Sequence, residues 1–150
     1  MIGTLTSSEM KALLERNNLG RIGFSDGFTP YILPINYRYS NGYILAHSRP
    51  GSKIAIMREN PRVCFEVEEI RDNTNWHTVL AIGEFQEIRD ERERQHAMHE
   101  FNTHLMHLKL SSTATIGNQP DLFRKEGSLR PVIFRIIIQE LTGRYEVIGG

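Results

Sequence analysis

The first apolar pattern along the chain has the spacing of a short amphipathic helix. Residues 6–9 read Thr-Ser-Ser-Glu, the pattern of a capping box, in which two side chains satisfy the free N–H groups of a helix start. Met10, Leu13 and Leu14 then recur at intervals of three and four residues, which places them on one helix face. Asparagines and a glycine within 17–20 end the pattern, so we expect a helix at the start of the chain.

After this helix the apolar positions change to short β-prone runs separated by turns. We expect strands over 21–24, 30–39 and 43–48, because Ser-Asp-Gly and Ser-Asn-Gly turn signals lie between them. A helical run over 52–60 follows and stops before Pro61, because the residue that precedes a proline disfavours helical geometry.

The second half of the chain adds two long strands, a helix and a final strand. The remaining elements that we expect are strands over 62–70 and 77–89 around a polar loop at 71–75, a helix over 90–108, a long loop over 109–130, and a strand over 132–139 that 141–147 extends. Consecutive hairpins with helices between or after them favour an antiparallel barrel with accessory helices over alternating βαβ units. Residues 1–150 fit a single domain.

The amino-acid composition argues against several classes of binding partner and of protein. Lys plus Arg and Asp plus Glu both number 18, so no net field attracts nucleic acid, and an anion site has to be local. No apolar run approaches the roughly 20 residues of a membrane span. The single cysteine, Cys64, excludes a disulfide within the chain. We therefore expect a cytoplasmic protein without a nucleic-acid or membrane partner.

The strand over 43–48 runs through a glycine turn into a helix that begins Gly51-Ser52-Lys53. Backbone N–H groups at a helix start are unpaired and the helix dipole is positive there, so Ser52 and Lys53 can hold a phosphate dianion. The alternative is an ordinary serine N-cap followed by a solvated lysine. The pattern also lacks the full spacing of a P-loop.

Taken together, the motifs resemble the FMN-binding split-barrel superfamily that includes pyridoxamine 5′-phosphate oxidase. Within it the chain is similar to the smaller flavin-nucleotide-binding branch that includes nitroimidazole-resistance proteins. The order and spacing of the motifs are specific, although each motif alone is weak, and the resemblance covers residues 5–90 best. The segments that carry it are 20–23, 34–37, 47–48, 51–53, 60–65, 76–79 and 82–84.

The resemblance implies a mainly β fold with accessory helices, an antiparallel split β-barrel that binds FMN. It places the strand over 31–36 beside the isoalloxazine ring, His47 and Ser48 near the ribityl chain and phosphate, and Lys53 on the phosphate. It also implies a homodimer with each flavin at the interface. The residues expected to bind the cofactor are Pro34, Ile35, Asn36, Tyr37, His47, Ser48, Ser52, Lys53, Trp76 and Thr78.

The implied activity is reduction of a small organic acceptor, such as a nitro compound or quinone, with electrons from NAD(P)H. His47 is a candidate proton donor near the flavin, and Trp76 either stacks on the ligand or plugs a barrel end. Vitamin B6 oxidation is not expected, because Tyr31 and Asn36 stand where the oxidase pattern carries Arg and Lys. The alternatives are an FMN carrier or sensor without turnover, and a barrel that binds no flavin.

Two further clusters have simpler explanations. His96, His99, His104 and His107 share an arc of about 140° on the expected helix, opposite its apolar face, but they extend along about 17 Å of helix and cannot converge on one metal ion. We expect a solvated face there, or a contact with a partner or the flavin, and no metal site. Alternation along a strand makes Glu66 and Glu68 one solvated face.

Overall fold

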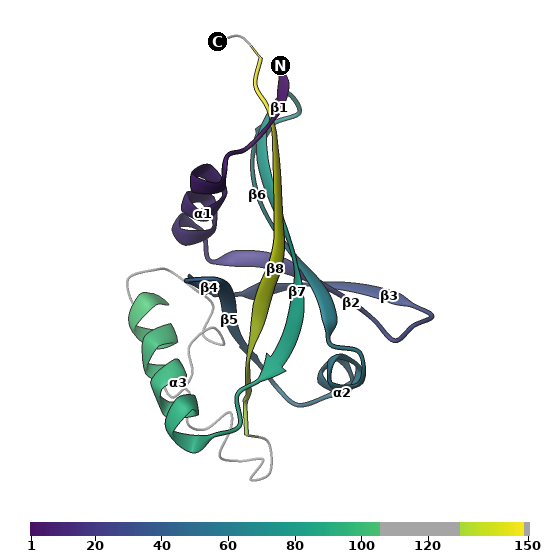
Figure 1. Cartoon of the computed structure of the whole chain (residues 1–150), viewed down its shortest axis with the longest axis vertical. Coiled ribbons are helices and arrows are strands. Elements are labelled where there is room, and N and C mark those ends of the chain that lie inside the picture. The colour runs from purple at the N-terminus through teal and green to yellow at the C-terminus, as the bar shows by residue number, and fades with distance from the viewer. Residues whose placement is uncertain (106–129, 149–150) are drawn as a thin grey trace.

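The structure, a computed structural model of the chain, describes residues 1–105 and 130–148 (Figure 1). Its elements, in chain order, are β1 (Ile2–Thr4), α1 (Ser7–Arg16), β2 (Leu19–Ser25), β3 (Pro30–Asn36), β4 (Arg38–Ser40), β5 (Tyr43–Ser48), α2 (Ser52–Glu59), β6 (Arg62–Asp72), β7 (Asn75–Glu87), α3 (Glu91–Leu105) and β8 (Val132–Glu146).

The strands of the described residues form one eight-stranded sheet, and every strand pair in it is antiparallel. The order is β3-β2-β6-β7-β8-β5-β4, and β1 pairs with the far end of β8. The two ends of this order, β3 and β4, are joined by Tyr37 alone, so the sheet has to curl until its edges approach each other. The fold is therefore a split barrel, as the resemblance implied.

The larger of two hydrophobic clusters fills the inside of the curl. Tyr37 is fully buried, and its ring meets that of Phe65 edge to face with the centroids 4.9 Å apart. The apolar face of α1 closes one side through Leu13 and Leu14, which are 1% exposed. A second cluster lies beneath α3 and includes Phe101. Figure 1 shows α1 and α3 on the same side of the β7–β8 column, with α2 on the other.

A bulge between β7 and β8 requires a glycine. The pairing register shifts between Ile82 and Gly83, and a Cβ on Gly83 would overlap the carbonyl oxygen of Ile137. No larger residue fits at such a close approach of two backbones.

Most of the predicted elements are confirmed. The capping box of α1 forms, with Thr6 and Glu9 each accepting from the other's backbone N–H at 3.2 and 2.9 Å. The predicted strand over 30–39 is wrong as one strand, because the backbone N–H of Tyr37 bonds to Asn18 instead of continuing the β-ladder and the run divides into β3 and β4.

Other boundaries also differ from the prediction. The strand predicted over 77–89 ends at Glu87, and β1 was not predicted at all. The predicted extension of the last strand is confirmed, because β8 is continuous through Glu146. The loop predicted over 109–130 lies outside the described residues except for its last position. Within the described ranges, no helix has the length and hydropathy needed to span a membrane.

Candidate functional site

A cavity of about 720 Å³ lies between β3, the end of β5 and the start of α2. Figure 1 places α2 directly below the β2–β3 hairpin, so these two elements face each other across it. The predicted residues that the structure brings together on its wall are Pro34, Ile35, Asn36, His47, Ser48, Ser52 and Lys53. The other residues that line the cavity are Phe24, Tyr31, Leu33, Arg49, Pro50, Gly51 and Ile56.

The polar end of the cavity is the start of α2. Gly51 is the N-cap residue, and no side chain caps the helix start by a hydrogen bond. The first N–H groups of a helix have no partner within the helix, and they carry the positive end of its dipole. Ser52 and Lys53 add a hydroxyl and an ammonium group to the same turn, so this end suits an anion.

Lys53 is a half-buried cation. Burial alone lowers the pKa of its ammonium group. Within the described residues no carboxylate forms an ion pair with it. A desolvated ammonium without a counter-charge is unfavourable, so an anion bound here would relieve that cost.

Gly51 leaves space at this end that the fold itself does not use. Its φ of 167° is an extended conformation open to any residue, and a Cβ at this position would meet no protein atom within 4 Å. The glycine is therefore required neither by the backbone conformation nor by packing. Because glycine has no side chain, the space in front of the helix start stays open to an approaching anion.

The opposite wall of the cavity is apolar and carries aromatic rings. Phe24 and Tyr31 stack with their ring centroids 5.2 Å apart and an interplanar angle of 20°. Leu33 also lines this wall, and Ile56 lines the cavity from α2. Near its edge the side-chain amide of Asn36 donates a 3.2 Å hydrogen bond to the carbonyl oxygen of Asn18. A flat aromatic ligand with a polar edge fits such a surface.

His47 connects the cavity to the core beneath α3. Its ring lies edge to face on Phe101 with the centroids 5.0 Å apart, and the same side chain lines the cavity. This packing holds the imidazole in place at the cavity wall.

Three predicted residues do not line the cavity of their own chain. The hydroxyl of Tyr37 donates to the carbonyl oxygen of Leu14 at 2.7 Å in the core, where burial raises its pKa. Trp76 donates to Glu146 at 3.1 Å. Thr78 donates to Glu66 at 3.0 Å.

The carboxylates of Glu66 and Glu68 share a face of β6, but that face is half-buried and not solvated as predicted. The reason is Arg21 on the neighbouring strand, whose guanidinium lies 3.9 Å and 2.7 Å from the two groups. Burial and a hydrogen bond with Glu68 raise the pKa of Glu66.

The histidines of α3 form no metal site in the described ranges, where no cluster of three or more His, Cys, Asp or Glu could hold an ion. His96 and His99 are exposed, and His96 lies 3.9 Å from Glu100. His107 and the side chain of His104 lie outside the described residues.

Sequence reasoning missed part of the lining, namely Phe24, Arg49, Pro50 and Ile56. Arg49 and Pro50 stand between two predicted motifs, and their position in the connecting turn could have been inferred. Phe24 and Ile56 gave no signal beyond that of core residues, because only the approach of α2 to the hairpin brings them together.

The chain matches the family described as pyridoxamine 5′-phosphate oxidase over residues 6–145. It is 27% identical over 149 residues to an uncharacterized protein of Rhizobium meliloti (strain 1021), a match that covers 99% of this chain and 97% of that one.

Solved structures give the same picture. A FAD-binding protein from Mesorhizobium loti is 30% identical with a TM-score of 0.72, over 97% of this chain and 96% of that one. A candidate 5-nitroimidazole antibiotic resistance protein from Bacteroides thetaiotaomicron shares the fold with a TM-score of 0.70 at 17% identity, over 97% of this chain and 89% of that one.

Proposed function

The chain belongs to the pyridoxamine 5′-phosphate oxidase family, and from this premise we propose that its cavity binds FMN in an oxidoreductase. The observation that carries the proposal is the half-buried Lys53, which has no ion-pair partner among the described residues and lies beside a start of α2 that no side chain caps. A relative at 30% identity is described as FAD-binding, which supports a flavin over other aromatic ligands.

The chain's own groups suggest how the flavin is held. The phosphate lies at Ser48, Ser52 and Lys53, where two hydroxyls, helix N–H groups and an ammonium meet. The ring system lies along the strand segment 33–36. FMN is favoured over FAD at this end, because its terminal phosphate fits a helix start that carries one cation.

The proposed reaction is transfer of electrons from NAD(P)H to a small organic acceptor of the nitro or quinone type. Bound flavin supplies the hydride and electron chemistry. His47 is fixed at the cavity wall by Phe101 and is the group proposed to deliver a proton to the acceptor.

Rapid mixing of the FMN-loaded protein with NADH or NADPH under anaerobic conditions tests turnover. We expect the flavin absorbance to bleach and to return when a quinone is added. If dithionite bleaches the flavin but neither nicotinamide does so within minutes, the oxidoreductase proposal is wrong and the non-catalytic FMN carrier or sensor is the better description. A visible spectrum taken first distinguishes bound flavin from haem and from an empty protein.

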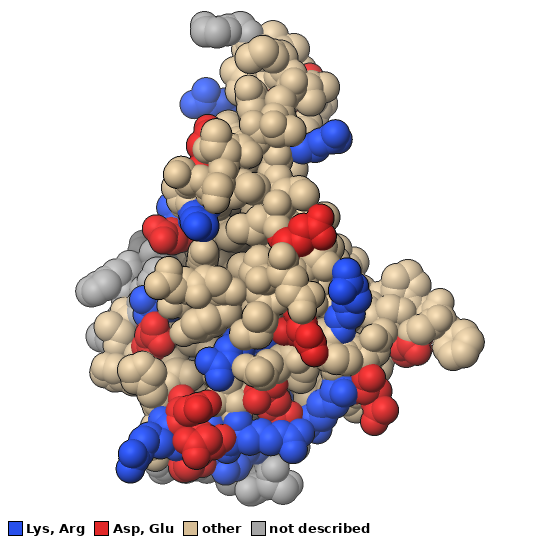
Figure 2. Space-filling view, in the orientation of Figure 1, with Lys and Arg blue, Asp and Glu red and all other residues tan. Residues whose placement is uncertain are grey.

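We also propose a homodimer. The β2–β3 hairpin exposes Phe28 (94%) and Ile32 (67%), and the distant tip of the β6–β7 hairpin exposes Ile70 (63%). Figure 2 shows the β2–β3 hairpin projecting from the molecule with few charged side chains. Apolar groups in such number on one protein are typical of an interface.

In the proposed dimer, Trp76 and Thr78 contribute to the cavity of the second copy, which gives these predicted residues a place that their own chain does not provide. Sedimentation at micromolar concentration tests the dimer. A 17.3 kDa monomer that still binds flavin would contradict it.

A further inference from the structure

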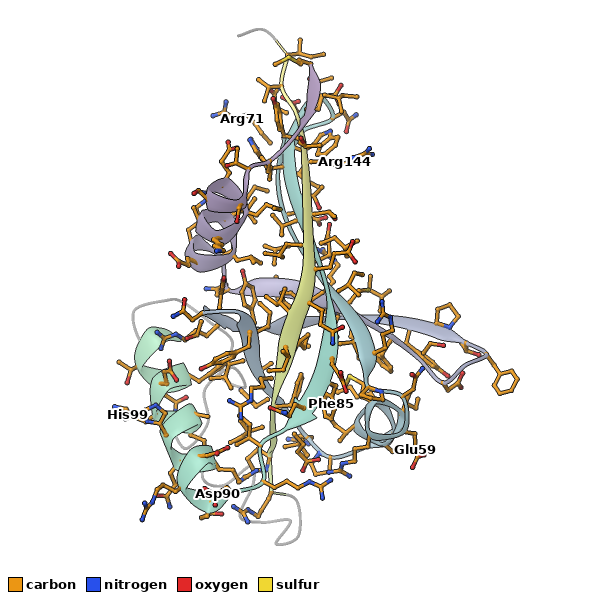
Figure 3. All side chains as sticks on the ribbon, in the orientation of Figure 1. Glu59, Arg71, Phe85, Asp90, His99 and Arg144 are labelled. Carbon is orange, nitrogen blue, oxygen red and sulfur yellow. The ribbon has the colours of Figure 1, made fainter. Side chains whose placement is uncertain are left out.

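A second cavity, of about 280 Å³, is lined by arginines from separate parts of the chain. Arg58 comes from α2, Arg89 from the connection after β7, Arg94 from α3, and Arg130 from just before β8. The cavity lies at the lower end of the molecule, where Figure 2 shows Lys and Arg interspersed with Asp and Glu. Figure 3 marks this end by Glu59 and Asp90, the chain neighbours of Arg58 and Arg89.

The charges around this cavity do not balance among the described residues. Glu87 accepts from Arg58 at 2.7 Å and lies 3.5 Å from Arg89. Glu91 pairs with Arg130 at 2.7 Å and lies 4.0 Å from Arg94. The four guanidinium groups outnumber the one lining carboxylate, that of Glu87, and the carboxylates of Glu91 and Asp90 beside the cavity.

Arg94 is the arginine of this cluster whose hydrogen-bonding groups are not all paired within the described residues. The residue is 7% exposed, and one terminal nitrogen donates to the carbonyl oxygen of Pro131 at 3.0 Å. Its buried Nε has no hydrogen-bond partner among the described residues. Burial, and then the charge of Arg130, lower the pKa of Arg94. A buried donor without a partner is costly and is often satisfied by a ligand.

We propose that this arginine cavity binds a phosphoryl group. A phosphate anion supplies negative charge where guanidinium groups are in excess, and its oxygens accept paired hydrogen bonds from guanidinium forks. The cavity volume of about 280 Å³ admits a phosphate or a pyrophosphate. The inference does not depend on flavin binding, because none of these arginines lines the larger cavity.

The phosphoryl group has two possible sources, since Pro50 lines both cavities. It is either the second phosphate of a dinucleotide flavin whose first phosphate lies at Lys53, or part of a separate phosphorylated molecule. The chemistry of recognition is the same for both, so one probe tests the site.

Calorimetric titration of inorganic pyrophosphate into the full-length protein tests the proposal. Arg130→Gln is the main variant, because Arg130 is 63% exposed and its loss leaves the core intact. We expect it to weaken pyrophosphate binding by about tenfold or more, the usual effect of losing a charge-assisted contact. Arg94→Met should do the same if it folds. Arg71→Gln, at the opposite end of the molecule in Figure 3, is the matched control and should bind as the parent does.

A second arm identifies the source by titrating FAD and FMN into the parent and Arg130→Gln. A loss of affinity for FAD alone assigns the site to a dinucleotide flavin, whereas unchanged affinity for both assigns it to a separate molecule. The proposal is overturned if the parent does not bind pyrophosphate at millimolar concentration. It is also overturned if Arg130→Gln binds pyrophosphate as tightly as the parent, or if only Lys53→Ala weakens that binding.

Discussion

The side-chain amide of Asn60 donates a 2.9 Å hydrogen bond to the carbonyl oxygen of Ser25. Asn60 is the C-cap of α2 and Ser25 is the last residue of β2, so this bond ties the helix to the base of the β2–β3 hairpin. The hairpin and the helix carry facing walls of the larger cavity. One side chain therefore helps to set the separation of the two walls.

Replacing Asn60 by aspartate keeps its size but removes the donor. We expect Asn60→Asp to lower the free energy of unfolding by about 1 kcal/mol, the usual contribution of one hydrogen bond. FMN affinity should fall as well, because the helix start is no longer held against the hairpin. Urea unfolding and a flavin titration measure the two effects. Unchanged FMN affinity in a destabilised variant would show that this bond does not position the cavity walls.

Gly51 is expected to serve the ligand and not the fold. Gly51→Val should leave the unfolding temperature of the flavin-free protein within about a degree of the parent, since the position is extended and open. It should weaken FMN binding, because the added methyl groups occupy the space before the helix start. Gly83→Ala is the contrasting control: it should destabilise the protein, because its Cβ overlaps Ile137. A Gly51→Val protein that binds FMN normally would contradict this assignment.

The hydroxyl of Tyr37 is expected to act in the core. Tyr37→Phe removes the 2.7 Å hydrogen bond to Leu14 and leaves a buried carbonyl oxygen unpaired. The free energy of unfolding should fall by about 1–3 kcal/mol, with FMN affinity unchanged. Chemical unfolding and flavin titration of the same sample check both parts. A clear loss of FMN affinity would instead assign the hydroxyl to the flavin.

The Arg16–Glu69 pair joins α1 to β6. It should make the free energy of unfolding depend on pH in the acidic range. Hydrogen bonds from Arg16, at 2.7 and 2.8 Å, lower the pKa of Glu69 to about 2 from an ordinary 4.5. The stabilisation is therefore complete above about pH 4.5 and is lost as the pH falls toward 2.

In Glu69→Gln this part of the pH dependence should disappear. The difference from the parent should stay below about 1 kcal/mol, because both side chains are partly exposed. Urea unfolding at several pH values between 2 and 6 measures it. Parallel curves for parent and variant would contradict the pKa assignment.

Local patterns predicted the elements of this fold well, and long-range geometry explains where they failed. The capping box at Thr6 and the turn at Gly42 depend on neighbours in sequence, so both could be read directly. The division of the run over 30–39 depends on a bond between Tyr37 and Asn18, which only the folded chain brings together.

In the candidate site too, local sequence predicted some residues, whereas others depend on contacts that only the folded chain makes. Ser52 and Lys53 were found because their chemistry follows from their place at a helix start. Phe24 and Ile56 were not, because they meet only when α2 packs below the hairpin. The arginine cavity was equally hidden, since its side chains come from positions as distant as Arg58 and Arg130.

The comparison of FMN with riboflavin in the parent and in Lys53→Ala tests the central claim most directly. The two ligands differ only by the phosphate, so their affinity difference isolates the contact proposed for Lys53. By quenching of flavin fluorescence, we expect the parent to prefer FMN and Lys53→Ala to lose about 1.5–3 kcal/mol of FMN binding with riboflavin binding unchanged. Lys53→Arg should lose less. If Lys53→Ala binds FMN as tightly as the parent, or loses both ligands equally, the phosphate does not lie at the start of α2.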